Sequence, residues 1–325
     1  MARVENKQLH VTRNPGMPLD LDWVERTVVN RSAAERRAAT LPGRRTVKKN
    51  HQAAYLLKAI SLMDLTTLSG DDTPGTVRRL CDKAKHPVRA ELLEALDAQD
   101  LNLTTAAVCV YHEFVEVAVK ALQGTNIPVA AVAAGFPHGL SPLRERIHEI
   151  KASVAAGATE IDIVISRQHV LNENWQALYD EVQMFREACG EAHLKSILAT
   201  GELSTLTNVA RASLVAMMAG SDFIKTSTGK ETANATLPVG IVMARQIRGY
   251  HEKTGYMIGF KPAGGIRTAK QACDWLIMMK EELGVRWVQP DLFRLGASTL
   301  LSDIERQLEH SITGRYSAFN RHPMG

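Results

Sequence analysis

Short apolar runs alternate with longer amphipathic segments along most of the chain. From residue 53 onward, apolar runs of about five to eight residues are separated by segments in which apolar residues recur every three or four positions. The short runs are typical of buried strands and the longer segments of covering helices. We expect eight strands, at 59–63, 106–111, 129–134, 160–165, 194–199, 223–226, 257–260, and 287–288 extending to 293–295.

Three intervening segments carry clear helix signals. Ser141 and Pro142 predict an N-cap followed by a first helical turn. The apolar residues after them recur at helical spacing, which predicts one buried stripe of Leu143, Ile147, Ile150 and Val154. Similar stripes predict helices over 175–185 and from Thr268 to Gly284.

The alternation of strands and helices predicts a parallel sheet covered on both faces. The runs at 129–134 and 161–165 are apolar nearly throughout, as strands beneath helices are. Eight strands favour a closed (β/α)8 TIM barrel over an open doubly wound sheet, and no Gly-x-Gly-x-x-Gly follows the first strand. We therefore expect a barrel domain at 53–310, a helical or irregular N-terminal extension at 1–52 and a tail at 311–325.

The extension holds most of the excess positive charge. Residues 1–60 contain 12 Lys and Arg against 5 Asp and Glu, whereas the whole chain has a net charge of only +4. Proline, glycine and charged residues leave only 21–29 and 33–39 as short predicted helices. We interpret the basic cluster of Arg44, Arg45, Lys48 and Lys49 as a solvated linker; a weak nuclear signal or an RNA-contacting patch is the alternative.

Composition predicts a soluble, cytoplasmic protein. Hydrophobic residues make up 45% of the chain and charged residues 23%, which is ordinary for a globular protein. The apolar stretch at 127–136 is too short to span a bilayer, and no secretory signal stands at the N-terminus. The scattered cysteines fit a reducing compartment; they are Cys81, Cys109, Cys189 and Cys273.

Polar groups in apolar settings mark the expected catalytic end of the barrel. In a TIM barrel the chemistry lies at the carboxyl ends of the strands, where this chain places Asp64, Asp162, Lys225 and Lys261. A single strand lysine is usually an edge charge with its amine in water. Two lysines on neighbouring strands, about 4.8 Å apart, repel each other, and burial further disfavours their charge. The pair predicts a lysine with a lowered pKa, which Schiff-base chemistry requires, and Asp162 supplies the opposing charge.

Glycine-rich and hydroxyl-rich loops follow the later strands. Thr226 to Lys230, Gly264-Gly265 and Gly296 to Thr299 are compatible with phosphate binding through backbone N–H groups and a helix N-terminus. The Ser-Thr-Gly-Lys string fails as a nucleotide-binding P-loop because Ile224 stands where its first glycine is required.

Metal chemistry is a competing possibility, because a bound zinc ion can also activate a carbonyl substrate. None of the 11 histidines forms His-x-His or His-Glu-x-x-His. His138 alone is expected at the barrel mouth, as a structural or substrate-adjacent residue, and Cys109 is expected in the core or the pocket wall. We predict no metal and no cofactor.

Five motifs together resemble the deoxyribose-phosphate aldolase family, in its extended, animal-type form. They occur in order between about residues 55 and 310: Met63-Asp-Leu-Thr-Thr-Leu68, Glu160-Ile-Asp-Ile-Val-Ile165, Asp222-Phe-Ile-Lys-Thr-Ser-Thr-Gly-Lys230, Phe260-Lys-Pro-Ala-Gly-Gly-Ile-Arg267 and Arg294-Leu-Gly-Ala-Ser298. The resemblance implies a class I, metal-independent aldolase that cleaves 2-deoxy-D-ribose 5-phosphate reversibly to D-glyceraldehyde 3-phosphate and acetaldehyde, in deoxyribonucleotide catabolism. It also implies a homo-oligomer that needs neither membrane nor nucleic acid.

The same resemblance assigns roles to residues. Lys225 would form the imine, Lys261 would depress the pKa of Lys225 and join a proton relay, and Asp162 would transfer protons. Asp64 and Thr66 would lie near the reacting hydroxyl or orient the lysines. The phosphate would be held by Thr228, Gly229, Lys230, Gly264, Gly265, Gly296, Ser298 and Thr299.

Three alternatives stay open. The barrel could be a phosphosugar isomerase in which the lysines act as electrostatic clamps. It could also have an additional nucleic-acid-binding or protein-binding role through its basic arm. Tyr316 is a candidate to reach the active site from the tail, as a C-terminal tyrosine does in short-form relatives, or it belongs to a disordered terminus.

Overall fold

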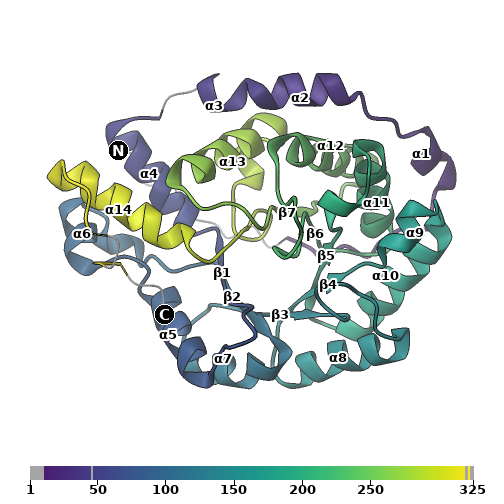
Figure 1. Cartoon of the computed structure of the whole chain (residues 1–325), viewed down its shortest axis with the longest axis horizontal. Coiled ribbons are helices and arrows are strands. Elements are labelled where there is room, and N and C mark those ends of the chain that lie inside the picture. The colour runs from purple at the N-terminus through teal and green to yellow at the C-terminus, as the bar shows by residue number, and fades with distance from the viewer. Residues whose placement is uncertain (1–10, 45–46, 319–320, 323–325) are drawn as a thin grey trace.

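The structure, a computed structural model, describes residues 11–44, 47–318 and 321–322. Eight parallel strands form one sheet in which each strand from β1 to β6 pairs with the next, and β8 pairs with β1. Isolated parallel bridges from Phe260 to Phe293 and from Ala263 to Gly296 join the β7 and β8 segments. The sheet therefore closes into a ring enclosed by helices, and the expected (β/α)8 TIM barrel is confirmed (Figure 1).

The strands are short and most lie at the predicted positions: β1 Met63–Thr66, β2 Ala107–Tyr111, β3 Val129–Ala133, β4 Glu160–Val164, β5 His193–Ile197, β6 Phe223–Lys225, β7 Gly259–Lys261 and β8 Leu295–Ala297. Two predictions were wrong in part. The apolar run at 59–63 begins in helix α4 (Lys49–Ile60) and becomes a strand only at Met63. The run at 287–288 starts in a 3-10 turn, η4 (Val285–Trp287). Short apolar runs suit a buried helix end as well as a strand, so their periodicity cannot separate the two.

Helices cover the outside of the barrel. The longer ones are α5 (Pro74–Lys85), α7 (Val115–Ala121), α8 (Leu143–Ala155), α10 (Trp175–Cys189), α11 (Leu206–Met218), α12 (Leu237–Thr254), α13 (Ala269–Glu282) and α14 (Leu300–Thr313). Shorter pieces are α6 (Ala90–Ala95), α9 (Arg167–Leu171), η1 (Gln99–Leu101), η2 (His112–Phe114) and η3 (Thr200–Glu202). Thr268 caps α13 in a capping box with Gln271, which confirms the predicted start of this helix.

Helix α8 departs from its predicted pattern. Its N-cap is Pro142 rather than Ser141, and no side chain caps it. Of the predicted apolar stripe only Ile150 is fully buried, and Leu143 is exposed. Arg146 takes an inward position instead, where its guanidinium pairs with Glu181 at 2.7 Å. A buried ion pair of this kind cannot be read from hydrophobic spacing, which counts arginine as a surface residue.

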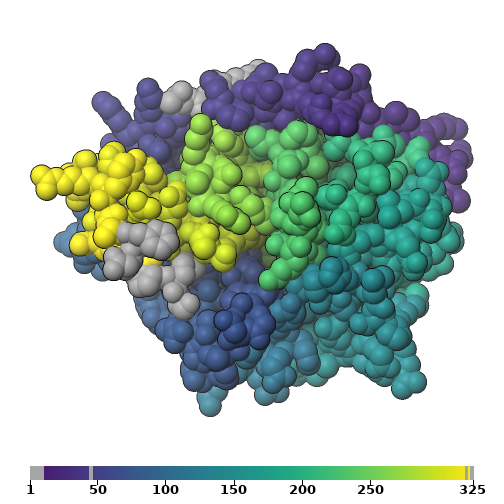
Figure 2. All heavy atoms as spheres, viewed as in Figure 1, coloured from purple at the N-terminus to yellow at the C-terminus, as the bar shows by residue number. Residues whose placement is uncertain are grey.

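The N-terminal extension packs along one side of the barrel. Helices α1 (Leu21–Arg26), α2 (Arg31–Ala39) and α3 (Leu41–Arg44) run outside α11, α12 and α13, and the space-filling view shows them against the underlying helices (Figures 1 and 2). The predicted helices at 21–29 and 33–39 correspond to α1 and α2. The predicted boundary between residues 52 and 53 falls within α4.

Asn14 fastens this extension to the barrel. Its buried side chain donates from Nδ2 to the carbonyls of Met217 and Ser221 and accepts from the hydroxyl of Tyr250. Its backbone N–H donates to Asp222, the residue before β6. Across the described residues, no helix combines the length and the apolar character that crossing a membrane requires.

Candidate active site

Two lysines from neighbouring strands meet at one carboxylate inside the barrel. Lys225 on β6 and Lys261 on β7 are partners in the sheet register. Nζ of Lys225 donates to Oδ2 of Asp162, on β4, at 2.7 Å, and Nζ of Lys261 donates to the same oxygen at 2.8 Å. The side chains of Lys225, Lys261 and Asp162 are 3%, 1% and 0% exposed. The structure thus brings together the three residues predicted to be catalytic.

A wider buried network surrounds this trio. Asp64, on β1, forms ion pairs with Lys261 at 2.5 Å, with Lys195 at 3.1 Å and with Arg294 at 2.6 Å. Lys195 also pairs with Glu160, and it lies 3.3 Å from the second oxygen of Asp162. Arg294 completes the network through Glu160 at 2.8 Å. Asp64 thus connects Lys261 to Lys195 and Arg294.

This network has one basic group more than it has carboxylates. Three lysines and one arginine pair with two aspartates and one glutamate. With every group ionised, the buried cluster carries one positive charge without a counter-charge, and burial makes such a charge unfavourable. Loss of a proton from one lysine balances the cluster.

Lys225 is the lysine whose pKa falls. Burial, first, and the nearby Lys261 ammonium lower the pKa of Lys225, and the Asp162 carboxylate opposes them without reversing the direction. For Lys261 burial acts in the same direction, but Asp162 and Asp64 outweigh it and raise the pKa of Lys261 well above its usual range. The surroundings therefore make Lys225 easier to deprotonate, whereas Lys261 holds its proton more tightly than a lysine in water.

The carboxylates of the network stay ionised. Burial alone would raise the pKa of Asp162, but Lys195, Lys225 and Lys261 together hold it far below its usual range. Asp64 is held well below its usual range in the same way, against burial, by Arg294, Lys195 and Lys261. Asp162 is thus an anion between Lys225 and Lys261 in the free protein.

The sequence does not predict Lys195, Glu160 and Arg294 as site residues, because the expected site includes only residues at the carboxyl ends of the strands. Glu160 and Asp162 are two positions apart on β4, so both point to the same side of the strand. Lys195 is the register partner of Asp162 on β5. An acidic pair at strand spacing beside a lysine in an apolar strand was the available signal.

A cavity of about 330 Å³ opens above the network at the carboxyl ends of β1, β6, β7 and β8. It is lined by Lys225 and by all the residues predicted to bind substrate or phosphate except Asp64, namely Thr66, Thr228, Gly229, Lys230, Gly264, Gly265, Gly296, Ser298 and Thr299. The candidate nucleophile, Lys225, and the loops predicted to bind phosphate (the phosphate cradle) therefore line the same cavity.

The cradle loops depend on glycine and on a helix start. Gly229 and Gly264 have φ angles of +83° and +78°, which side chains rarely tolerate. A Cβ at Gly264 would also lie only 2.6 Å from Oδ1 of Asn234. Helix α14 starts directly after Thr299, whose side chain makes no capping bond. Its first amide groups thus lack a side-chain acceptor at the N-cap, and such helix ends favour anions.

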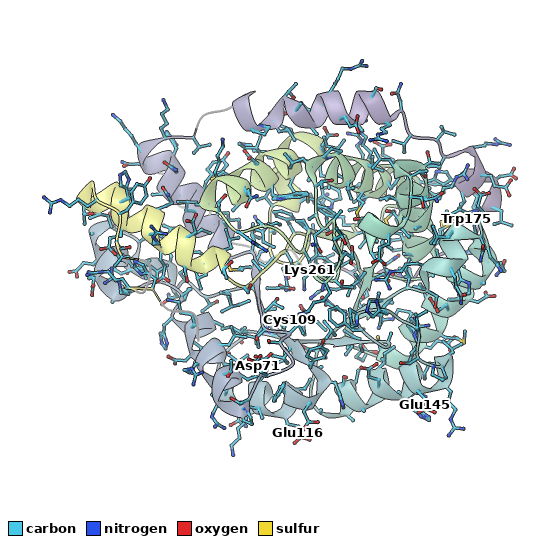
Figure 3. The ribbon with its side chains drawn as sticks, in the orientation of Figure 1. Asp71, Cys109, Glu116, Glu145, Trp175 and Lys261 are labelled. Atoms are coloured by element: carbon cyan, nitrogen blue, oxygen red, sulfur yellow. The ribbon has the colours of Figure 1, made fainter. Side chains whose placement is uncertain are left out.

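An apolar wall lies beside the lysines. Cys109, Ala130 and Val132 form a buried cluster against which Tyr111 and Phe136 pack. Burial raises the pKa of the Cys109 thiol, so this residue belongs to the wall in its neutral form. Figure 3 shows Cys109 and Lys261 toward the centre of the ring, whereas Glu116 and Glu145 project from its rim.

Two residues predicted near the mouth, Tyr316 and His138, are not among the residues that line this cavity. Tyr316 stacks on His310 of α14, with ring centroids 4.1 Å apart, and is 58% exposed rather than directed into the cavity. His138 is exposed, and its carbonyl accepts from Arg167. Within the described ranges no three His, Cys, Asp or Glu side chains are grouped to hold a metal ion.

The sequence matches a family model. The model described as DeoC/LacD family aldolase matches residues 58–285. The chain belongs to the DeoC/LacD aldolase family. A human protein described as deoxyribose-phosphate aldolase is 63% identical over 313 residues, which is 96% of this chain and 98% of that one. A mouse protein of the same description is 63% identical over 311 residues, or 95% and 98% of the two chains. The enzyme class expected from the motifs, an aldolase, is confirmed.

Solved structures of aldolases share this fold. A putative deoxyribose-phosphate aldolase from Toxoplasma gondii superposes with a TM-score of 0.67 at 22% identity, covering 83% of this chain and 98% of that one. One from Coccidioides immitis gives 0.62 at 23%, covering 85% and 98%. A deoxyribose phosphate aldolase from Aeropyrum pernix, described as a unique tetrameric structure, gives 0.56 at 20%, covering 89% and 100%.

Proposed function

We propose that this aldolase cleaves 2-deoxy-D-ribose 5-phosphate reversibly to D-glyceraldehyde 3-phosphate and acetaldehyde through a Schiff base on Lys225. One observation supports this most: Lys225, with its lowered pKa, lines the cavity that the glycine loops also line. A neutral amine is the nucleophile that imine formation needs. The human and mouse relatives, described as deoxyribose-phosphate aldolases, support the choice of substrate.

The reaction begins with attack of the Lys225 amine on the aldehyde carbon, C1, of the open-chain sugar. The resulting carbinolamine takes up a proton on its hydroxyl and loses water to give a protonated imine. Asp162 is ionised at rest and accepts one hydrogen bond from each lysine, so a proton can move between the two amines across its carboxylate. Lys261, which is protonated in the free protein, supplies the proton for the departing water.

Carbon–carbon cleavage follows from the imine. A proton leaves the C3 hydroxyl through a water bound to Asp162, the C2–C3 bond breaks, and its electron pair enters the imine to form a neutral enamine. D-glyceraldehyde 3-phosphate leaves as the first product. The enamine is protonated at carbon, and water then hydrolyses the imine to release acetaldehyde and Lys225. The imine takes the electron pair that a metal would otherwise stabilise, so the proposal includes neither a metal nor a cofactor.

The phosphate anchors the substrate in this scheme. Lys230 supplies a positive charge, while the Gly264-Gly265 turn and the start of α14 supply backbone N–H groups. Binding energy at the phosphate then orients C1 toward Lys225. We place the reaction in deoxyribonucleotide catabolism, in the cytoplasm, and expect a homo-oligomer.

Borohydride trapping tests the proposal. Incubation with 2-deoxy-D-ribose 5-phosphate and borohydride should leave a reduced adduct on the peptide that contains Lys225, found by mass spectrometry. Lys225→Met should give neither adduct nor acetaldehyde, and a chelator should leave the wild-type rate unchanged. Acetaldehyde release without an adduct, or an adduct on another lysine, would overturn the mechanism.

A phosphosugar isomerase is less consistent with these observations, because the chain belongs to an aldolase family. It would retain activity after treatment with borohydride and substrate. A binding role for the basic arm stays a separate proposal, tested by salt-dependent RNA binding that deletion of residues 1–50 abolishes. Arg45 lies outside the described residues; Lys48 and Lys49 are exposed.

A further inference from the structure

Thr228 lines the proposed phosphate cradle, yet its hydrogen-bond donors are already occupied. Its backbone N–H donates to Oε1 of Glu231 at 2.7 Å, and its hydroxyl donates to the same oxygen at 2.9 Å. The hydroxyl oxygen in turn accepts from the backbone N–H of Lys230 at 3.1 Å. Thr228 therefore cannot offer either donor to a phosphate without giving up Glu231.

Glu231 connects two of the cradle loops. The residue is buried, with 8% of its surface exposed. The backbone carbonyl of Glu231 accepts a hydrogen bond from Nδ2 of Asn234 at 3.0 Å. The side chain of Asn234 packs against Gly264 and occupies the space that a Cβ at this position would fill. Glu231 thus links the turn after β6, which holds Lys230, to the glycine turn after β7.

A carboxylate beside an anion site would ordinarily weaken phosphate binding by repulsion. The structure favours another role, because one oxygen of Glu231 accepts two hydrogen bonds from Thr228, which anchors the turn before Gly229. We infer that Glu231 is a positioning residue: it holds the turn from Thr228 to Lys230 in the shape that binds the substrate phosphate. This inference rests on the proposed function, since it concerns the phosphate end of the same site.

The two roles predict opposite results for matched variants. Glu231→Ala removes the charge and the acceptor, whereas Glu231→Gln removes the charge but keeps a carbonyl oxygen for both donors. If Glu231 positions the turn, Glu231→Ala should weaken the binding of inorganic phosphate about tenfold, or about 1.4 kcal/mol, and Glu231→Gln should stay within about threefold of wild type. If Glu231 acts by repulsion, both variants should bind phosphate more tightly.

Catalysis gives a second readout. Glu231→Ala should raise KM for 2-deoxy-D-ribose 5-phosphate about tenfold with kcat within about twofold, and kcat/KM for unphosphorylated 2-deoxy-D-ribose should not change. Thr228→Val, which removes one of the two hydrogen bonds and keeps every charge, should raise KM about threefold. Glu187 is a carboxylate on the exposed side of α10, so Glu187→Ala is the control for loss of one negative charge.

Isothermal titration with inorganic phosphate separates this inference from the proposed function. If wild-type protein binds phosphate but releases no acetaldehyde, the proposed reaction fails while the titration still decides the role of Glu231. Unchanged phosphate affinity in Glu231→Ala and Thr228→Val, or equal loss of kcat with both substrates, overturns the inference. Should Glu231→Ala fail to fold, Glu231→Gln and Thr228→Val still distinguish positioning from repulsion.

Discussion

Replacement of Lys261 by methionine should raise the pKa of Lys225. Both Nζ atoms lie within 2.8 Å of one Asp162 oxygen, so they are no more than about 5.5 Å apart. At an effective dielectric constant of about 20, two unit charges at that distance repel by roughly 3 kcal/mol, equivalent to about two pKa units. Without Lys261 the network also has as many basic groups as carboxylates, so a protonated Lys225 balances it.

The pH dependence of imine formation measures this effect. Only neutral Lys225 attacks the aldehyde, so the trapping rate rises with pH through the pKa of Lys225. In Lys261→Met this rise should move to higher pH by one to two units, as expected from the repulsion that is removed. The pH-independent rate also falls if Lys261 donates protons, but that loss does not move the midpoint.

Lys230→Met is the matched control, because it removes an exposed lysine from the same mouth. It should weaken phosphate binding and leave the midpoint of the trapping profile unchanged. A midpoint that stays in place in a folded Lys261→Met protein, or moves to lower pH, would refute the electrostatic reasoning.

Three further predictions concern stability. Asn14→Ala should lower the free energy of unfolding by about 2–3 kcal/mol in urea titrations, because buried partners of its side chain lose their hydrogen bonds; a loss below about 0.5 kcal/mol would show that the extension is not fastened there. Lys195→Met should cost about 3–5 kcal/mol, since three buried carboxylates lose a close charged partner, and a neutral result in the same titration would contradict this. The folded state holds the pKa values of Asp64 and Asp162 far below the unfolded value near 3.9. Their contribution to the free energy of unfolding is therefore present above about pH 4 and is lost as the pH falls toward the folded pKa values. Acid titration followed by circular dichroism should show a steep loss of folded protein below about pH 4, and the loss should be shallower in Asp64→Asn.

Local sequence patterns predicted the order of strands and helices in the barrel better than the residues at which they begin and end. A buried strand such as β3 is apolar on both sides and stands between amphipathic helices, so its composition specifies its place. The first strand was misplaced because α4 ends in an apolar run that resembles a strand. The inward Arg146 on α8 was missed because its partner Glu181 belongs to another helix. The division into extension, barrel and tail stays a prediction.

The sequence by itself determined which lysines to consider. Lys225 and Lys261 stand in apolar strands that are consecutive in the chain, and parallel strands joined by helices become neighbours in a barrel. The glycine and hydroxyl residues of the cradle followed from the same rule. Local composition and strand order are therefore enough to predict that these lysines and loop residues lie at one end of the barrel.

The resemblance implied that the pKa of Lys225 is lowered, but only the tertiary structure supplied the physical reason. The difference between the two lysines depends on charges contributed by three other strands and by the residue before β8: Asp64 from β1, Glu160 and Asp162 from β4, Lys195 from β5 and Arg294 next to β8. Electrostatic energy depends on distance and burial rather than on separation along the chain. The excess of one cation over the buried carboxylates, and the two aspartates that keep Lys261 charged, appear only when the closed barrel brings these side chains within a few ångströms.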